Sequence, residues 1–138
     1  MIGFGEALLR EAGHRIETAR RALRQRKYAY CLRQSQEAVE LSLKGVLRLK
    51  GVEYPKFHDV SDVLLRSSGL FPVWFSNQIR FFAEVSRKLA ETREASMYGF
   101  EELGQAPDQA VSRKSARIAF ESAQKVFKAC KTLFSRRR

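Results

Sequence analysis

The sequence predicts an all-α protein, an antiparallel up-and-down bundle of four long helices plus one short helix. Apolar residues recur every three or four positions along nearly the whole chain, which is the spacing of one helix face. No stretch alternates apolar and polar residues over the length of a strand. The segments between the periodic stretches are short, so consecutive helices are expected to lie side by side in opposite directions.

The first two long helices are predicted over residues 4–26 and 28–50. The first has an apolar face made of Phe4, Leu8, Ala12, Ile16, Ala19 and Leu23. The second has an inward face made of Leu32, Ser35, Val39, Ser42, Leu43 and Val46. Its opposite side carries a polar stripe made of Arg33, Glu37, Glu40, Lys44 and Arg48. Gly51 is expected to end the helix, because glycine readily adopts the left-handed conformation found just after a last turn.

A loop over residues 51–55 leads into the short helix, which is predicted over residues 60–67. Pro55 disfavours helical geometry at the residue before it. Asp59 or Ser61 is a plausible N-cap, because their side-chain oxygens can accept a hydrogen bond from a first-turn N–H. The inward residues of this short helix are expected to be Val60, Val63 and Leu64.

The last two long helices are predicted over residues 72–96 and 108–134. Pro72 suits the first turn of a helix. The aromatic cluster over residues 71–82 is expected to be core, or alternatively a face that a second copy covers. The final helix has an inward face made of Val111, Ile118, Ser122, Val126, Ala129 and Leu133. Cys31 and Cys130 are expected to be buried thiols, with a bridge between them as the alternative.

The 138 residues, 44% of them apolar, suffice for one hydrophobic core, so a single domain over residues 1–138 is expected. No apolar run approaches the ~18 residues that cross a bilayer, and no membrane contact is expected. Glu6 and the absence of a leading basic region argue against a secretory signal. A cytoplasmic location is therefore expected.

The net charge of +11 is concentrated at the two ends of the chain. Residues 1–50 carry eleven Lys and Arg against five Asp and Glu, and residues 109–138 carry nine against one. Residues 51–108 are acidic, with six against nine. If the end helices pack together, their basic faces could merge and attract phosphates. The alternative is a solvated basic surface that serves solubility or docking to a partner.

Several kinds of chemistry are absent from the sequence. There is no glycine-rich phosphate loop, no dinucleotide fingerprint and no HExxH motif. Two histidines and two isolated cysteines do not have the spacing of a zinc site, so no metal and no cofactor are expected. No nucleophile elbow occurs, and neither cysteine has an activating histidine nearby in the sequence.

Two segments carry a resemblance to a known family. The first runs from Ser35-Gln36-Glu37-Ala38-Val39-Glu40 through Lys44 to Pro55-Lys56-Phe57-His58-Asp59. The second is Arg93-Glu94-Ala95-Ser96-Met97-Tyr98-Gly99-Phe100 with Pro107 and the following helix. Together they resemble the HEPN family, a nucleotide-binding domain of higher eukaryotes and prokaryotes, over roughly residues 30–130.

The resemblance implies a helical bundle that is commonly a homodimer. It also implies a possible pairing with a minimal nucleotidyltransferase protein, in a toxin–antitoxin-like system. Some family members are metal-independent ribonucleases that carry an arginine and, after four to six intervening residues, a histidine. This chain departs from that pattern, because no arginine stands at that distance before His58. A catalytic role is therefore not expected, and no catalytic residue is assigned.

The residues that the resemblance offers for binding a nucleotide or RNA phosphate are Gln36, Glu40, Lys44, His58, Arg93 and Tyr98. Each has a structural alternative. The Glu40–Lys44 spacing also gives an ordinary stabilising pair on a helix. His58 could bind phosphate when protonated or help to cap the short helix. Arg93 could clamp a phosphate or pair with a glutamate. Tyr98 could stack on a base or anchor a loop.

The leading interpretation is a non-enzymatic, dimeric module that binds a nucleotide or RNA phosphate. Two alternatives stay open. One is a ribonuclease toxin in which polar groups near His58 orient the 2′-hydroxyl and stabilise the phosphate. The other is a protein-interaction module without a ligand, whose basic faces dock an acidic partner.

Overall fold

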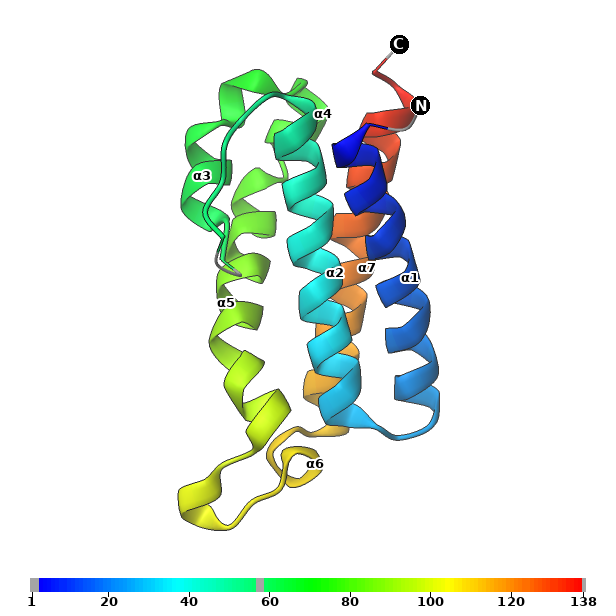
Figure 1. Ribbon diagram of the computed structural model, residues 1–138, viewed down its shortest axis with the longest axis vertical. Helices are drawn as coiled ribbons and strands as arrows, with labels where there is room; N and C mark the ends of the chain where they lie inside the picture. Colours follow the sequence, from blue (N-terminus) through cyan, green and yellow to red (C-terminus); the bar gives the residue numbers. More distant parts are fainter. Residues whose placement is uncertain (1–2, 57–58, 138) are drawn as a thin grey trace.

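The computed structural model describes residues 3–56 and 59–137, and within them the chain is all-α, as predicted. Four long helices run alternately down and up the molecule (Figure 1). They are α1 (Phe4–Arg24), α2 (Tyr28–Leu49), α5 (Ile79–Tyr98) and α7 (Arg113–Ser135). The predicted antiparallel bundle of four long helices is therefore confirmed.

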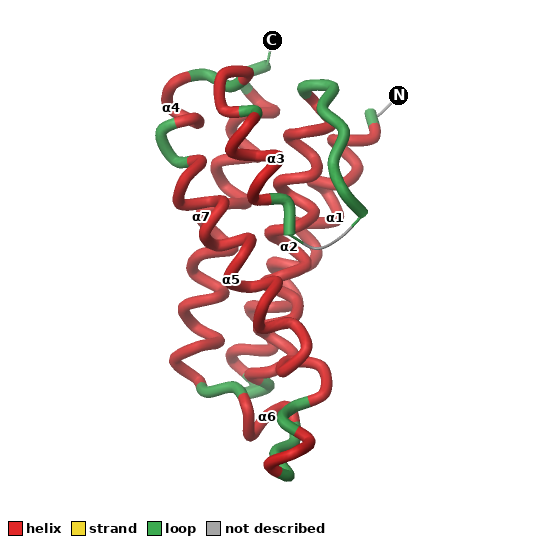
Figure 2. Tube along the Cα trace, turned by 90° about the vertical axis from the view of Figure 1, so that its left-hand side faces the viewer, coloured by secondary structure: helices red, strands yellow, loops and turns green. Residues whose placement is uncertain are grey.

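Short elements close the two ends of the bundle. At one end are α3 (Ser61–Arg66), the 3₁₀ turn η1 (Ser68–Leu70) and α4 (Val73–Ser76). At the other end are the 3₁₀ turn η2 (Glu101–Leu103) and α6 (Pro107–Ala110) (Figures 1 and 2). The sequence predicted one short helix, and the described residues form three, because both of the later long helices begin further along the chain than expected.

The predicted helix over residues 72–96 is broken into α4 and α5. At Gln78 the backbone N–H bonds to the carbonyl of Phe75, three residues back, and this tighter turn separates the two helices. No glycine or proline marks this break in the sequence. The last helix starts at residue 113 because Val111 is extended and Ser112 is its N-cap, where Oγ accepts the N–H of Ser115 at 3.0 Å.

The second helix, α2, packs against α1, α5 and α7. Its predicted inward residues, Leu32, Ser35, Val39, Ser42, Leu43 and Val46, are all buried. The opposite polar stripe is also partly covered, and Lys44 is only 9% exposed. The cause is the return of the chain after α2, which runs down beside α2 and α5 before α3 begins (Figure 1). Lys44, which was expected on the surface, therefore lies inside the molecule, whereas Arg48 of the same stripe is exposed.

The first two helices cross at a pair of glycines. A Cβ atom at Gly45 would lie 2.9 Å from the carbonyl oxygen of Gly5, and one at Gly5 would lie 2.7 Å from that of Gly45. Real Cβ atoms do not approach backbone oxygens so closely. Glycine at both positions therefore permits the contact between α1 and α2.

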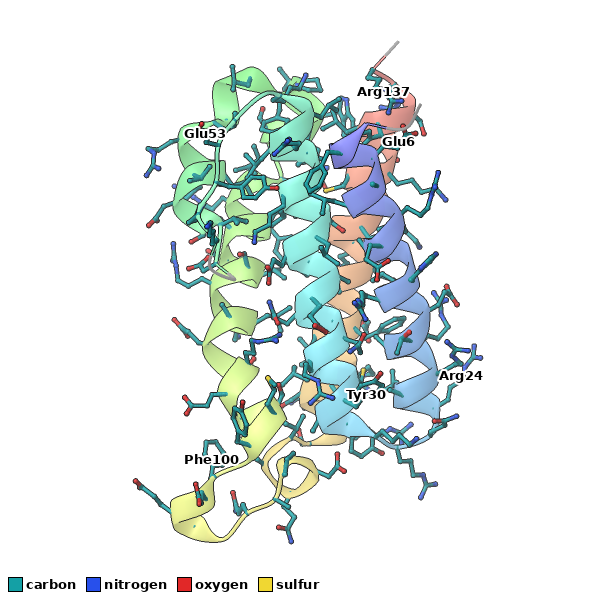
Figure 3. All side chains as sticks on the ribbon, in the orientation of Figure 1. Glu6, Arg24, Tyr30, Glu53, Phe100 and Arg137 are labelled. Carbon is teal, nitrogen blue, oxygen red and sulfur yellow. The ribbon has the colours of Figure 1, made fainter. Side chains whose placement is uncertain are left out.

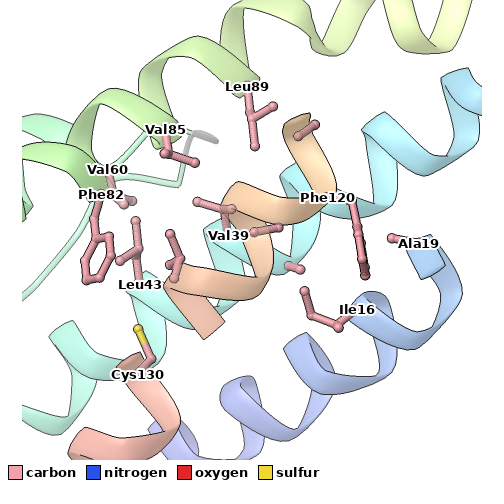
Figure 4. Close-up of a cluster of buried hydrophobic side chains, with 14 of the residues drawn as sticks. Ile16, Ala19, Val39, Leu43, Val60, Phe82, Val85, Leu89, Phe120 and Cys130 are labelled. Atoms are coloured by element: carbon pink, nitrogen blue, oxygen red, sulfur yellow. The ribbon is translucent and has the colours of Figure 1, made fainter. Parts of the chain in front are cut away.

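The core fills the space between the four long helices. Ile16, Val39, Leu43, Val85 and Phe120 converge there from all of them (Figure 4). Most of the predicted aromatic core is confirmed, since Phe71, Phe75 and Phe82 are buried. Two inward assignments were wrong: Phe4 is 56% exposed and Ile118 is 49% exposed. Leu9 occupies the buried face of α1 instead, and Ala119 and Phe120 occupy that of α7.

Both cysteines are buried free thiols, as predicted. The Cys31 thiol lies 3.7 Å from the carbonyl oxygen of Ala116, near the start of α7. Cys130 lies 14 residues further along the same helix. That is about 21 Å of helix, too far for a disulfide. Within residues 3–56 and 59–137, none of the helices has the length and apolar character that crossing a bilayer demands.

Candidate functional site

A chain of polar side chains runs along the face of α2 that α5 and the returning loop cover. Gln36, Glu40 and Lys44 lie four residues apart, so they share one side of the helix. Gln36 Nε2 donates to Glu40 Oε1 at 3.0 Å. Lys44 Nζ donates to Glu40 Oε2 at 2.9 Å. The side chains of Glu40 and Lys44 are only 15% and 11% exposed, so water screens this ion pair poorly.

Arg93 joins this chain from α5. Its Nη1–H donates to Gln36 Oε1, across 57 positions of sequence. Gln36 is 2% exposed, and its amide therefore links a guanidinium on one side to a carboxylate on the other inside the bundle. We call Gln36, Glu40, Lys44 and Arg93 the α2–α5 polar cluster.

The loop after α2 supplies the third side of the cluster. Gly51 adopts φ +71°, and the N–H of Val52 bonds back to Leu47, which turns the chain onto α2 as the sequence predicted. This return places the ring of Tyr54 5.4 Å from Lys44 Nζ, within range of a cation–π contact. Tyr54 was not predicted as a site residue, and no pattern in the sequence pairs it with Lys44.

Further along the sequence, Asp59 links the chain between α2 and α3 to α5 by hydrogen bonds. Its carboxylate accepts the N–H of Ser61 at 2.9 Å and the hydroxyl of Ser86 at 3.1 Å. Ser86 Oγ in turn accepts the N–H of Val60. Asp59 thus holds the start of α3, but the N-cap itself is Val60, without a side-chain cap bond, so the predicted N-cap at Asp59 or Ser61 was wrong. Ser86 precedes Arg93 by seven residues on α5, which is two turns or about 10 Å along the axis.

The remaining two predicted site residues have different outcomes. His58 lies outside the described residues. Tyr98 is 67% exposed at the last turn of α5, about 140° around the helix from Arg93, so it lies outside the α2–α5 polar cluster. The helix ends there because Gly99 has φ +73°, and a Cβ at that position would meet the carbonyl oxygen of Gln105 at 2.1 Å. Phe100, just beyond, lies at the end of the bundle opposite Glu53 (Figure 3).

The charges of the cluster favour an anion. Arg93 and Lys44 are cations and Glu40 is a carboxylate, while Gln36 is neutral. A guanidinium has five N–H donors in a planar fork that matches phosphate oxygens, so Arg93 has more donors than its bond to Gln36 uses. Arg93 is half-buried, so its fork is held by packing yet reachable from solvent.

The thiols do not belong to this site. Burial raises the pKa of Cys31 to about 11, although a hydrogen bond with Ser35 lowers it in part. Burial raises the pKa of Cys130 further above its ordinary value. Neither is a thiolate nucleophile near neutral pH. In the part of the chain that the structure describes, no three His, Cys, Asp or Glu side chains come close enough to hold a metal ion.

Comparison with known proteins adds one finding. The family model of the HEPN domain matches residues 6–133, nearly the whole chain. Searches of the curated proteins and of the solved structures found no significant match.

Proposed function

The chain belongs to the HEPN domain family, helical modules of the nucleotide-binding and ribonuclease type, and from this premise we propose that it binds a nucleotide or RNA phosphate at the α2–α5 polar cluster. The observation that supports this proposal is the Arg93–Gln36 contact. It places a half-buried guanidinium against a buried amide, and that amide also bonds to the carboxylate of a buried ion pair.

Burying such a cluster costs free energy that an apolar core would not cost. A buried ion pair is often no more stabilising than apolar residues of the same volume. Gln36 and Lys44 nevertheless occupy the middle of the best-covered helix of the bundle. This arrangement suits a binding site, because an arginine fork held in place loses little further freedom when it binds a phosphate.

In the proposed complex, Arg93 donates to two phosphate oxygens and Lys44 lowers the potential energy of the added negative charge. Gln36 holds the guanidinium plane in position. Tyr98 lies about 7.5 Å further along α5 and about 140° around it, so its exposed ring is proposed to stack on a base that extends beyond the cluster. His58 is proposed to add a donor to the phosphate when it is protonated.

Calorimetric titration with ATP, GTP and a short RNA tests the proposal. We expect saturable binding at low salt and a loss of affinity of about tenfold or more in Arg93→Gln, since a charge-assisted hydrogen bond contributes about 1.5–3 kcal/mol. Arg87→Gln is the matched control, because Arg87 is an exposed arginine of the same helix. Absence of saturable binding, or equal losses in the two variants, would overturn the proposal.

A homodimer is proposed from a second feature, the apolar groove between α5 and α7. This groove encloses about 450 Å³, and Val85, Leu89, Phe100, Val111 and Ile118 are among the residues that line it. Phe100 and Ile118 are 46% and 49% exposed, which leaves apolar surface that self-association would cover. Light scattering is expected to give twice the mass of 15.9 kDa, and Ile118→Lys is expected to give the monomer. A monomeric wild type at micromolar concentration would contradict this.

We also propose that the protein acts with a minimal nucleotidyltransferase partner in a toxin–antitoxin-like pair. The support is the family membership together with the strongly basic surface, which suits a partner with an acidic face. Co-expression with such a protein encoded beside it should give a complex that survives size exclusion. If the two proteins elute separately at low salt, this part of the proposal is wrong.

A further inference from the structure

A second surface, remote from the α2–α5 polar cluster, combines exposed aromatic rings with cations. It lies where α4 and the start of α5 meet the second half of α7, on one side of the bundle (Figure 2). An open depression of about 590 Å³ lies between them, lined by Trp74, Gln78, Phe81, Lys125, Lys128 and Thr132, with Asn77 and Ala129. We call it the α4–α7 surface.

The charges of this surface all have one sign. None of the lining residues is acidic, and the lysines at 125 and 128 are both exposed. Arg136 adds a third cation at the end of α7. These three residues stand 3 and 8 positions apart and so lie along one side of the helix, over about 16 Å. A polyanion laid along this side would meet several cations in succession.

The aromatic rings are placed among these cations. The guanidinium carbon of Arg136 lies 5.0 Å from the centre of the Trp74 ring, and Lys125 Nζ lies 5.8 Å from that of Phe81. Trp74 is half-buried, and its ring meets that of Phe75 edge-on, which holds it in place. Phe81 is 40% exposed. Flat rings fixed beside exposed cations suit the binding of single-stranded nucleic acid, because bases stack on the rings while cations neutralise the phosphates.

We propose that the α4–α7 surface binds single-stranded nucleic acid through base stacking on Trp74 and Phe81 and phosphate contacts from Lys125, Lys128 and Arg136. An acidic protein segment would use the cations but would leave the rings without stacked bases. A duplex would hide its base faces, so it would bind by charge alone. The proposal does not depend on nucleotide binding at the α2–α5 polar cluster, since the two sites share no residue.

The chain's only tryptophan lies in this surface, so its fluorescence reports on binding directly. We expect oligo(dT) of about twelve nucleotides to quench Trp74 saturably at low salt. Lys125→Gln/Lys128→Gln should weaken binding severalfold and reduce the salt slope by about 1.4, since each neutralised phosphate of a single strand contributes about 0.7. Lys27→Gln/Lys114→Gln is the control, because it removes the same charge from the opposite end of the bundle.

Stacking is tested separately with Trp74→Leu, which keeps an apolar side chain against Phe75. By anisotropy of a labelled oligonucleotide, this variant should bind at least about fivefold more weakly while its circular dichroism is unchanged. Arg93→Gln should retain the full quenching, which separates this site from the first. The proposal is overturned if oligo(dT) does not quench Trp74, if the control pair weakens binding as much, or if polyglutamate quenches equally.

Discussion

The Glu40–Lys44 pair gives the sharpest prediction about the α2–α5 polar cluster. The two side chains are 15% and 11% exposed, and their N–O distance is 2.9 Å. Removing one partner of such a pair leaves the other charge buried without it, which typically costs about 3–5 kcal/mol. Because Glu40 also accepts from Gln36, we expect Lys44→Met to cost about 3 kcal/mol, a large part of the 5–15 kcal/mol typical of a folded domain.

Urea unfolding followed by circular dichroism measures this cost, provided that the dependence of the unfolding free energy on urea concentration is the same in both proteins. Glu40→Gln is the partner variant, and it should cost about 2 kcal/mol because Lys44 then loses its counter-charge. The double variant should be about 2 kcal/mol more stable than the sum of the two single changes predicts, since neither charge is left behind. If Lys44→Met costs less than about 1 kcal/mol, or if the two changes are additive, the pair is not buried in the way described.

Three further predictions concern the helix crossing and the two buried thiols. Gly45→Ala should lower the free energy of unfolding by about 1–2 kcal/mol although alanine favours helices, because the new Cβ meets the Gly5 carbonyl oxygen. Gly13→Ala is the control: its Cβ meets only the movable ring of Phe127 at 3.2 Å, so it should stay within about 0.5 kcal/mol of wild type. Equal effects of the two changes in urea unfolding would refute this. Burial raises the pKa of the Cys31 thiol from 9.0 to about 11, so its contribution to stability is fully present below pH 9.0 and is lost as the pH rises toward about 11. Between these two pH values, thermal melts should show a larger loss of stability in the wild type than in Cys31→Ala. Ellman's reagent should leave both thiols unmodified in the native protein at pH 8 and modify two in denaturant, and rapid native reaction would show that they are not buried.

The helical architecture could be predicted from the sequence because apolar residues recur at helical spacing along most of the chain. The inward face of α2 was predicted residue by residue, since six of its apolar and small residues recur at helical spacing and all are buried. The end of α2 was equally clear, because Gly51 is the residue type that a left-handed turn requires. These features depend on neighbours in sequence, which is the range over which patterns are informative.

What could not be predicted depends on contacts between distant segments. The break at Gln78 has no glycine or proline to mark it, and the late start of α7 depends on Ser112 taking the capping role. The burial of Lys44 follows from the path of the returning loop, which composition does not fix. Gln36 and Arg93 were named as binding candidates only through a resemblance, and their contact with each other was not predicted. Tyr54, Ser86 and the α4–α7 surface were missed as site features.

In the proposed complex, Arg93 presents its guanidinium to a phosphate from within the bundle. Nitrogen-15 NMR of the arginine side chains tests it most directly, with ATP and inorganic phosphate as separate titrants. We expect the Nε–Hε resonance of Arg93 to shift saturably with ATP, and we expect Gln36→Leu to abolish this shift by releasing the guanidinium. Shifts confined to exposed arginines such as Arg10 and Arg117, with Arg93 unmoved, would contradict it.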